Sequence, residues 1–229
     1  MIETFPDPES LAEAATDAVV RALDAGLRNA GSASLAATGG RSPGLVYDAL
    51  SLAPLDWARI RVTLTDERWA DVDSLDSNEG LVRKRLLQNR AADAHFLGLR
   101  GHAATPHAAA ELASHAFAGW PALDAALMGM GEDGHVASLF PGSPALATGL
   151  DRGAPACIDV PAGDGGPPSQ PRLTLTLRPL TTARVTLILI SGTEKRRVIE
   201  AAMAQGDPFV HPVAAVLKSA PALRILWTS

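Results

Sequence analysis

The sequence predicts an α/β fold with a mostly parallel sheet and helices on both of its faces. The chain repeats one unit, in which a short apolar run is followed by a polar or glycine-rich loop and then by a helical pattern. The apolar runs are nearly continuous, which is typical of strands that are buried on both faces. Strands that alternate with helices form parallel sheets. At 229 residues, we expect one domain over residues 1–229.

The first element that we expect is a helix beginning near Ser10. Ser10 and Glu13 form a capping-box pattern, and Gly31 ends the helix. Between them, apolar residues recur at helical spacing, at Leu11, Ala15, Val19, Leu23 and Leu27.

Four buried strands then follow, each with a loop at its carboxyl end. We expect strands in "SASLAA" (32–37), "RIRVTLT" (59–65), "ALDAALMGM" (122–130) and "ARVTLILI" (183–190). Helices are expected in residues 44–50, 79–87 and 196–204, and the Pro/Gly-rich segment Gly153–Pro171 is expected to be a surface loop. Ligands of such sheets bind outside the carboxyl ends of the strands. The four loops are therefore expected to converge on one site.

Composition excludes several classes of protein. A net charge of −5 without a Lys/Arg block argues against a nucleic-acid partner. Cys157 is the single cysteine, so no internal disulfide can form, and we interpret it as an inert thiol. The longest apolar run, "VTLILI", is too short to span a membrane. The N-terminal segment lacks the basic and apolar regions of a signal peptide, so we expect a cytoplasmic protein.

The loop "TGGRSP" has the composition of an anion site. Gly39 and Gly40 permit a sharp turn that presents backbone N–H groups, and Ser42 and Pro43 are suited to cap and begin the next helix. An ordinary strand-to-helix turn is the alternative, and two glycines alone do not exclude it. The loop is not a Walker motif, because G-K-[ST] is missing.

Other charged residues stand at similar loop positions. Lys195 in "SGTEK" falls in a first helical turn, where a cation is unfavourable unless an anion is near. Arg172 opens the strand "RLTLTL", and Arg68 lies in "DERW". Taken singly, each also fits a solvated surface position or a local salt bridge. Asn78, after Ser77, fits a helix cap.

His135 stands out among the six histidines. It follows the glycine-rich turn of "LMGMGEDGHVASLFPG", two residues after Asp133. An imidazole with an ordinary pKa near 6.5 accepts a proton at neutral pH. A metal site is disfavoured, since no second His or Cys lies at ligand spacing.

The glycines of this segment also spell G-x-G-x-x-G, the spacing of a dinucleotide-binding turn. That motif requires a helix that begins within it and an acidic residue about 20 positions later at a strand end. Here Pro141, Gly142 and Pro144 stop any long helix, and Asp151 follows a loop-like stretch. We therefore interpret the segment as a catalytic loop.

Five blocks in order resemble the 6-phosphogluconolactonases, of the sugar-phosphate lactonase/glucosamine-6-phosphate deaminase superfamily. They are "ATGGRSP", "TDERW" with "SNEGLVRKRLL", "GMGEDGHVASLFPG", "RLTLTL" and "SGTEKRRVIE", and they cover residues 35–200. The resemblance implies a Rossmann-like fold of the sugar-phosphate isomerase/lactonase type.

The resemblance further implies hydrolysis of 6-phospho-D-glucono-1,5-lactone to 6-phosphogluconate in the pentose phosphate pathway. It implies no metal or organic cofactor, and its partner is the small phosphorylated lactone. His135 would be the general base and Asp133 its orienting group. The Gly39–Gly40 amides, Lys195 and Arg172 would hold the phosphate, with Arg68 a weaker candidate. The full set of substrate-binding residues expected is Thr38, Gly39, Gly40, Arg41, Asp66, Arg68, Asn78, Arg172 and Lys195.

Alternatives remain at this stage. Similar deaminases carry a glutamate five residues after the histidine, where this chain has Phe140, which cannot transfer a proton. A non-catalytic sugar-phosphate binder stays open, and a general esterase is disfavoured because no G-x-S-x-G motif is present. The chain has "WADVD" where the family often has Val-Pro after "DER", so the shape of that loop is open. The oligomeric state is also open, and a monomer is compatible with the sequence.

Overall fold

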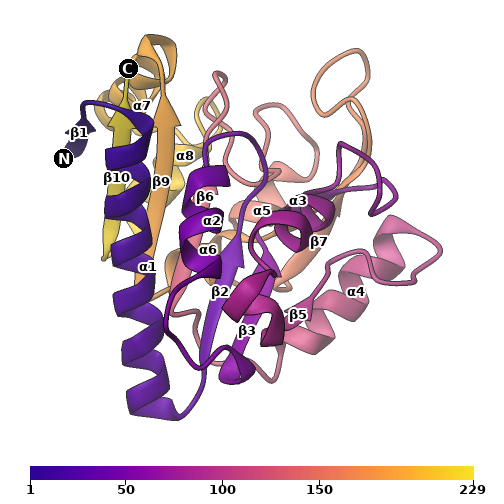
Figure 1. Ribbon diagram of the computed structural model, residues 1–229. Coiled ribbons are helices and arrows are strands. Elements are labelled where there is room, and N and C mark those ends of the chain that lie inside the picture. Colours follow the sequence, from indigo (N-terminus) through magenta and orange to yellow (C-terminus); the bar gives the residue numbers. More distant parts are fainter.

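The computed structural model describes residues 1–229 and contains two sheets (Figure 1). The larger has seven parallel strands, in the order β1-β10-β9-β6-β2-β3-β5. Their bounds are β1 Ile2–Phe5, β2 Ala33–Ala37, β3 Ile60–Leu64, β5 His95–Leu97, β6 Ala125–Gly129, β9 Val185–Ser191 and β10 Leu223–Thr228. This confirms the predicted α/β class with a mostly parallel sheet.

Helices lie on both faces of the large sheet. In Figure 1, α1 and α2 lie in front of it, whereas α6 and α8 lie behind it. The helices are α1 Pro8–Ala30, α2 Gly44–Ser51, α3 Asn78–Arg85, α4 Pro106–Phe117, α5 Leu146–Leu150, α6 Leu177–Thr181, α7 Thr193–Gln205 and α8 Val213–Ser219, with short 3-10 helices at Trp57–Arg59 and Asn89–Asp93. No helix is both long and apolar enough to cross a membrane.

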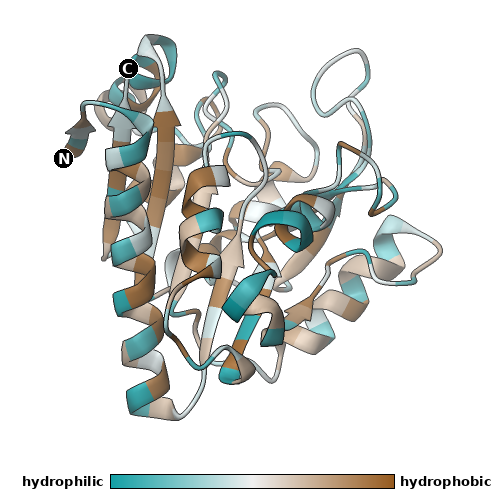
Figure 2. Cartoon of the chain, viewed as in Figure 1, coloured by the Kyte–Doolittle hydropathy of each residue, from teal (hydrophilic) through white to brown (hydrophobic).

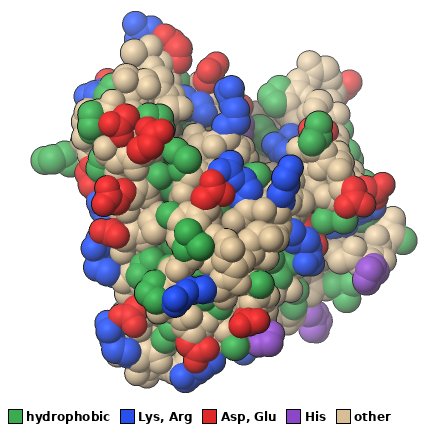
Figure 3. All heavy atoms as spheres, viewed as in Figure 1, with side chains coloured by type: hydrophobic (Ala, Val, Ile, Leu, Met, Phe, Trp, Pro, Cys, Tyr) green, Lys and Arg blue, Asp and Glu red, His purple; other side chains and the backbone are tan.

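A hydrophobic core of 53 buried residues lies between these layers. The central strands are apolar along their whole length, whereas α1 turns an apolar stripe inward and polar residues outward (Figure 2). This pattern is why β2, β3, β6 and β9 could be recognised in the sequence as strands covered on both faces. On the face shown in Figure 3, acidic side chains lie among the basic ones.

The structure corrects the expected start of the first helix. α1 begins at Pro8, and its N-cap is Asp7, whose Oδ1 accepts a hydrogen bond from the Ser10 N–H at 2.7 Å. Asp7 caps the helix because Pro8 lacks an N–H and fits the first helical position. The predicted end is correct, since Gly31 adopts φ +74° and its N–H donates to Leu27.

The second sheet was not predicted. It is antiparallel, in the order β4-β8-β7, with β4 Asp66–Arg68, β7 Cys157–Val160 and β8 Arg172–Leu175. β7 lies inside the expected surface loop Gly153–Pro171, and β4 lies in the loop that was expected after the strand 59–65. Both strands have three or four residues, too few for a hydrophobic period, and they form because β8 pairs with each of them. Cys157 on β7 is buried, and burial raises the pKa of its thiol to about 12.

Candidate active site

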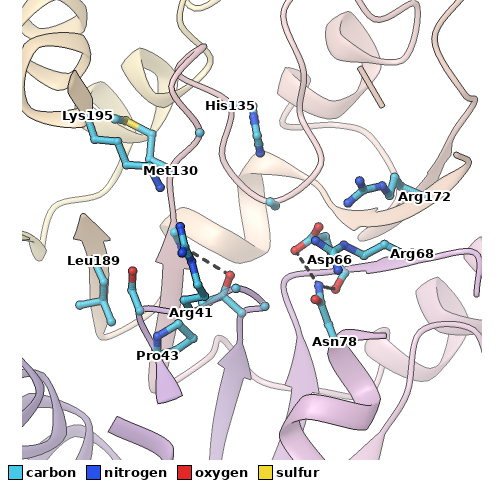
Figure 4. A pocket seen from close by; sticks show the side chains of 17 residues that line it. Arg41, Pro43, Asp66, Arg68, Asn78, Met130, His135, Arg172, Leu189 and Lys195 are labelled. Atoms are coloured by element: carbon cyan, nitrogen blue, oxygen red, sulfur yellow. Dashed lines mark hydrogen bonds between the residues drawn. The ribbon is translucent and has the colours of Figure 1, made fainter. Parts of the chain in front are cut away.

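One cleft lies beyond the carboxyl ends of β2, β6 and β9 (Figure 4). The structure brings His135 and all nine expected substrate-binding residues to its wall. Asp133 is the one predicted site residue outside the lining. Sequence reasoning did not select the rest of the wall, which comprises Ser42, Pro43, Gly129, Met130, Gly131, Ala137 and Leu189.

The glycine turn after β2 is fixed by Tyr47 of α2. The Thr38 N–H donates to the Tyr47 hydroxyl at 2.8 Å, and that hydroxyl donates to the Thr38 carbonyl at 2.5 Å. Burial raises the pKa of Tyr47 far above its ordinary value, so the hydroxyl stays protonated and able to donate. Gly40 has φ +93°, a conformation that favours glycine. The turn is thus held by a residue that the sequence reading overlooked.

Two details of this turn differ from expectation. The N-cap of α2 is Pro43, with no side-chain capping bond, so Ser42 does not cap the helix. Gly39 lies directly against the Asn78 side chain, leaving no room for a Cβ. This contact joins the large-sheet loops to the loop after β4.

The loop from β4 to α3 is organised around Glu67. Its buried carboxylate accepts backbone N–H bonds from Arg68, Asn78 and Glu79 at 2.7–2.8 Å and a bond from the Ser77 hydroxyl at 3.0 Å. Burial raises the pKa of Glu67, and these four donors oppose that rise. Because the donors include the first N–H groups of α3, Glu67 fixes the positions of Arg68 and Asn78.

Asp66 ties the same loop to the histidine loop. Its Oδ2 accepts a bond from the Ser138 hydroxyl at 2.7 Å, and its backbone carbonyl accepts from the Asn78 side chain at 2.8 Å. The Ser138 N–H donates to Thr174 of β8 at 3.1 Å. Asp66 therefore connects two loops at the cleft.

His135 and Asp133 face each other. The His135 Nδ1 lies 2.6 Å from Asp133 Oδ1, which also accepts the His135 backbone N–H at 3.0 Å. Burial raises the pKa of Asp133, but the hydrogen bond and charge of His135 lower it more, and the net pKa is below its ordinary value. An ionised Asp133 accepts a hydrogen bond from the His135 Nδ1–H, which keeps that proton on Nδ1 and leaves Nε2 free to accept a proton.

Two further contacts hold the histidine loop. Phe140 packs on the His135 ring with centroids 4.3 Å apart. Gly134 has φ +79°, lies against His211, and its carbonyl accepts the Val213 N–H at 2.9 Å. The contact between His211 and Gly134 spans 77 residues of sequence, which no local motif could indicate.

The cations of the cleft form two groups on opposite sides of His135 (Figure 4). Lys195 and Arg41 lie on one side, and Arg68 and Arg172 lie on the other. Lys195 and Arg172, both expected to hold the phosphate, line the same cleft on opposite sides of His135. No group of three or more His, Cys, Asp or Glu side chains is arranged to hold a metal ion.

The chain is similar to several known proteins over most of its length. A 6-phosphogluconolactonase of Pseudomonas aeruginosa is 46% identical over 209 residues, which cover 90% of this chain and 85% of the relative. A 6-phosphogluconolactonase of Rhizobium meliloti is 40% identical over 225 residues, covering 97% and 96%. The crystal structure of a 6-phosphogluconolactonase from Shewanella baltica superposes with a TM-score of 0.93 at 32% identity, covering 100% of this chain and 97% of that one.

A family model reaches across nearly the whole chain. It is described as glucosamine-6-phosphate isomerases/6-phosphogluconolactonase and matches residues 6–227. The expected resemblance is confirmed, and the chain belongs to the glucosamine-6-phosphate isomerase/6-phosphogluconolactonase family.

Proposed function

We propose that this protein hydrolyses 6-phospho-D-glucono-1,5-lactone to 6-phosphogluconate, with His135 as the general base. The observation that carries the proposal is the His135–Asp133 pair, which stands at a cleft with cations on both sides. The relatives named above are 6-phosphogluconolactonases, which supports the same reaction for this chain.

His135 acts on water. Asp133 holds the Nδ1 proton, so Nε2 takes a proton from a water molecule as the water oxygen bonds to C1 of the lactone. The tetrahedral intermediate then collapses, the bond between C1 and the ring oxygen breaks, and His135 returns its proton to that oxygen. The resulting acid loses a proton to give the carboxylate.

The phosphate is held on the Lys195 side of the cleft. Gly39 and Gly40 offer backbone N–H groups ahead of α2, and Lys195 lies in the first turn of α7. The acidic residues of α7 pair with Arg196 and Arg197, so Lys195 has no carboxylate partner on its own helix. Helix N-termini with free N–H groups favour anions. Arg172, across His135, is not needed for this contact.

Phe140 disfavours the deaminase alternative. The ring packs against His135 and is buried, so it offers no group that could assist opening of an amino sugar. A non-catalytic sugar-phosphate binder would not need the hydrogen-bonded Asp133. A turnover assay with the lactone and with glucosamine 6-phosphate distinguishes the proposed function from both alternatives.

The test is hydrolysis of freshly generated lactone, coupled to 6-phosphogluconate dehydrogenase and corrected for spontaneous hydrolysis. We expect turnover by the wild type, none with glucosamine 6-phosphate, and a loss in kcat of about 10²–10⁴-fold in His135→Ala. The matched control is His115→Ala, on α4 and outside the cleft. A His135→Ala variant that keeps kcat within a few-fold of wild type would falsify the base assignment. Binding of 6-phosphogluconate without any turnover would favour the binder.

A further inference from the structure

Arg68 and Arg172 form a pair of like charges with no internal counter-ion bound to them. They are directly opposite one another in the antiparallel register of β4 and β8. Like charges opposite each other on a sheet are destabilising. The Nε atoms of both arginines are buried without a hydrogen-bond partner. The one side-chain bond of the pair to the protein is from Arg68 Nη1 to the Asp76 carbonyl.

The charge of Arg68 affects the pKa of Arg172. Burial lowers the pKa of Arg172, and the Arg68 charge lowers it further, although Asp66, Asp76 and Glu67 oppose this. Arginine remains charged in proteins. The fold therefore holds two partly buried cations side by side, an arrangement that an anionic ligand relieves.

The arginine pair lies near His135, the proposed general base. The Arg172 guanidinium stands over the Phe140 ring at 5.7 Å, and that ring packs on His135. A second hollow adjoins the cleft and is lined by Arg68, Arg172, His135 and Phe140 together with the loop 163–169. Lys195 does not line this hollow. The arginine pair is thus near the imidazole and apart from the lysine.

We propose that Arg68 and Arg172 bind the C1 oxygen of the substrate as it becomes negatively charged, and then the carboxylate of the product. This inference rests on the proposed function, in which the phosphate occupies the Lys195 side. The substrate has one anionic group, at C6, and the product has a second one at C1. Two cationic sites on opposite sides of the base match those two groups. Charge that develops at C1 is stabilised by the preorganised guanidinium groups.

The first experiment is calorimetry with two ligands that differ only at C1. 6-Phosphogluconate has a C1 carboxylate, and glucitol 6-phosphate has a C1 hydroxyl. We expect Arg172→Gln to weaken 6-phosphogluconate by about 10- to 100-fold, as for the loss of a charged hydrogen bond, and to leave glucitol 6-phosphate unchanged. Lys195→Gln should weaken both ligands equally. Arg178→Gln, an exposed arginine on α6, is the matched control and should change neither.

The second experiment is kinetic. Arg172→Gln should lower kcat by about 10²–10³-fold with little change in KM, as when an oxyanion donor is lost. Lys195→Gln should mainly raise KM. Arg172→Lys should recover part of kcat because it restores the charge without the planar fork. Arg68→Gln provides a second variant, and circular dichroism of each variant checks that it is folded.

The outcomes separate this inference from the proposed function. Equal weakening of both ligands by Arg172→Gln and Arg68→Gln would mean that the arginines hold the phosphate, and the inference would be overturned. It would also be overturned if neither variant affected 6-phosphogluconate binding. Wild-type protein that binds with the expected selectivity but does not turn over the lactone would contradict the proposed function and leave the carboxylate site standing.

Discussion

The two sides of the cleft are built in different ways. On one side, the large parallel sheet presents the glycine turn after β2 and the first turn of α7, so much of the surface is backbone. On the other side, the small antiparallel sheet presents the side chains of Arg68 and Arg172. The backbone side depends on strand positions that a large core fixes, whereas the side-chain side depends on a few buried polar contacts. Single substitutions should therefore damage the second side more easily.

The largest expected effect on stability is at Glu67, which supports the arginine side. Glu67→Ala leaves three backbone N–H groups and the Ser77 hydroxyl without their acceptor. Each unsatisfied buried group costs about 1–3 kcal/mol. We expect the free energy of unfolding, measured by urea titration, to fall by about 3–5 kcal/mol.

The control for Glu67 is Glu111→Ala on α4, an exposed carboxylate whose loss should cost less than about 0.5 kcal/mol. A loss under about 1 kcal/mol at Glu67 would contradict its role as the organiser of the loop.

The sequence predicted the elements of the backbone side well, but on the side of Arg68 and Arg172 it did not predict how the strands pair. Continuous apolar runs indicated the central strands, and glycines after them indicated turns at one edge of the sheet, which placed Gly39, Gly40, His135 and Lys195 correctly in one cleft. Of the small sheet, only β8 was expected, as the strand "RLTLTL". β4 and β7 carry no such signal because they are short and form through pairing with β8. That pairing alone brings Arg68 opposite Arg172.

The next effect tests the contact between the two sides. Gly39→Ala adds a methyl group where the Asn78 side chain already lies, and such overpacking costs about 1–3 kcal/mol of stability. Asn78→Ala removes the atoms that the methyl group would meet. We expect the double variant to be more stable than the sum of the two single changes predicts, with a coupling of at least about 0.5 kcal/mol in urea titrations. Strict additivity would show that the two sides are independent.

Phe140 gives a smaller effect, which should appear in catalysis. Phe140→Leu removes the ring that packs on His135, and an aromatic pair of this kind is worth about 0.5–1.5 kcal/mol. If that energy holds the imidazole in position, kcat should fall by up to about tenfold. Phe117→Leu is the matched control, because Phe117 is also buried and packs on Trp120 at 4.9 Å. An equal fall in kcat for both variants would show that the Phe140 effect comes from general core packing and not from positioning of His135.

The smallest effect concerns pH. The pKa of Asp133 is lowered in the folded protein, so its interaction adds stability above the unfolded value of 3.8 and loses it as the pH falls through the lower folded value. Compared with Asp133→Asn, the wild type should therefore lose its advantage in the free energy of unfolding below pH 3.8. The carboxylate is 35% exposed, so the advantage should stay below about 1 kcal/mol. Urea titrations at a series of acidic pH values measure it, and a difference that grows toward low pH would reverse the assigned sign.

The contacts around His135 show why the long-range contacts of the site could not be predicted from the sequence. The Asp133 bond is local and was anticipated, although two residues of a tight turn need not face each other. The Ser138–Asp66 bond and the His211 contact with Gly134 join segments 72 and 77 residues apart. Such contacts depend on how the loops fold over the sheet edge, and no periodicity or motif encodes them.

The buried Cys157 allows a single fluorescent label to be placed beside this cleft. Thiolates react with maleimides and neutral thiols do not, so a buried thiol with a pKa of about 12 is silent toward such reagents at neutral pH. A cysteine introduced at exposed Ser169, on the loop beside Arg172, would then be the single reactive position in the chain. A fluorophore attached there would report ligand binding directly, without removal of the native cysteine.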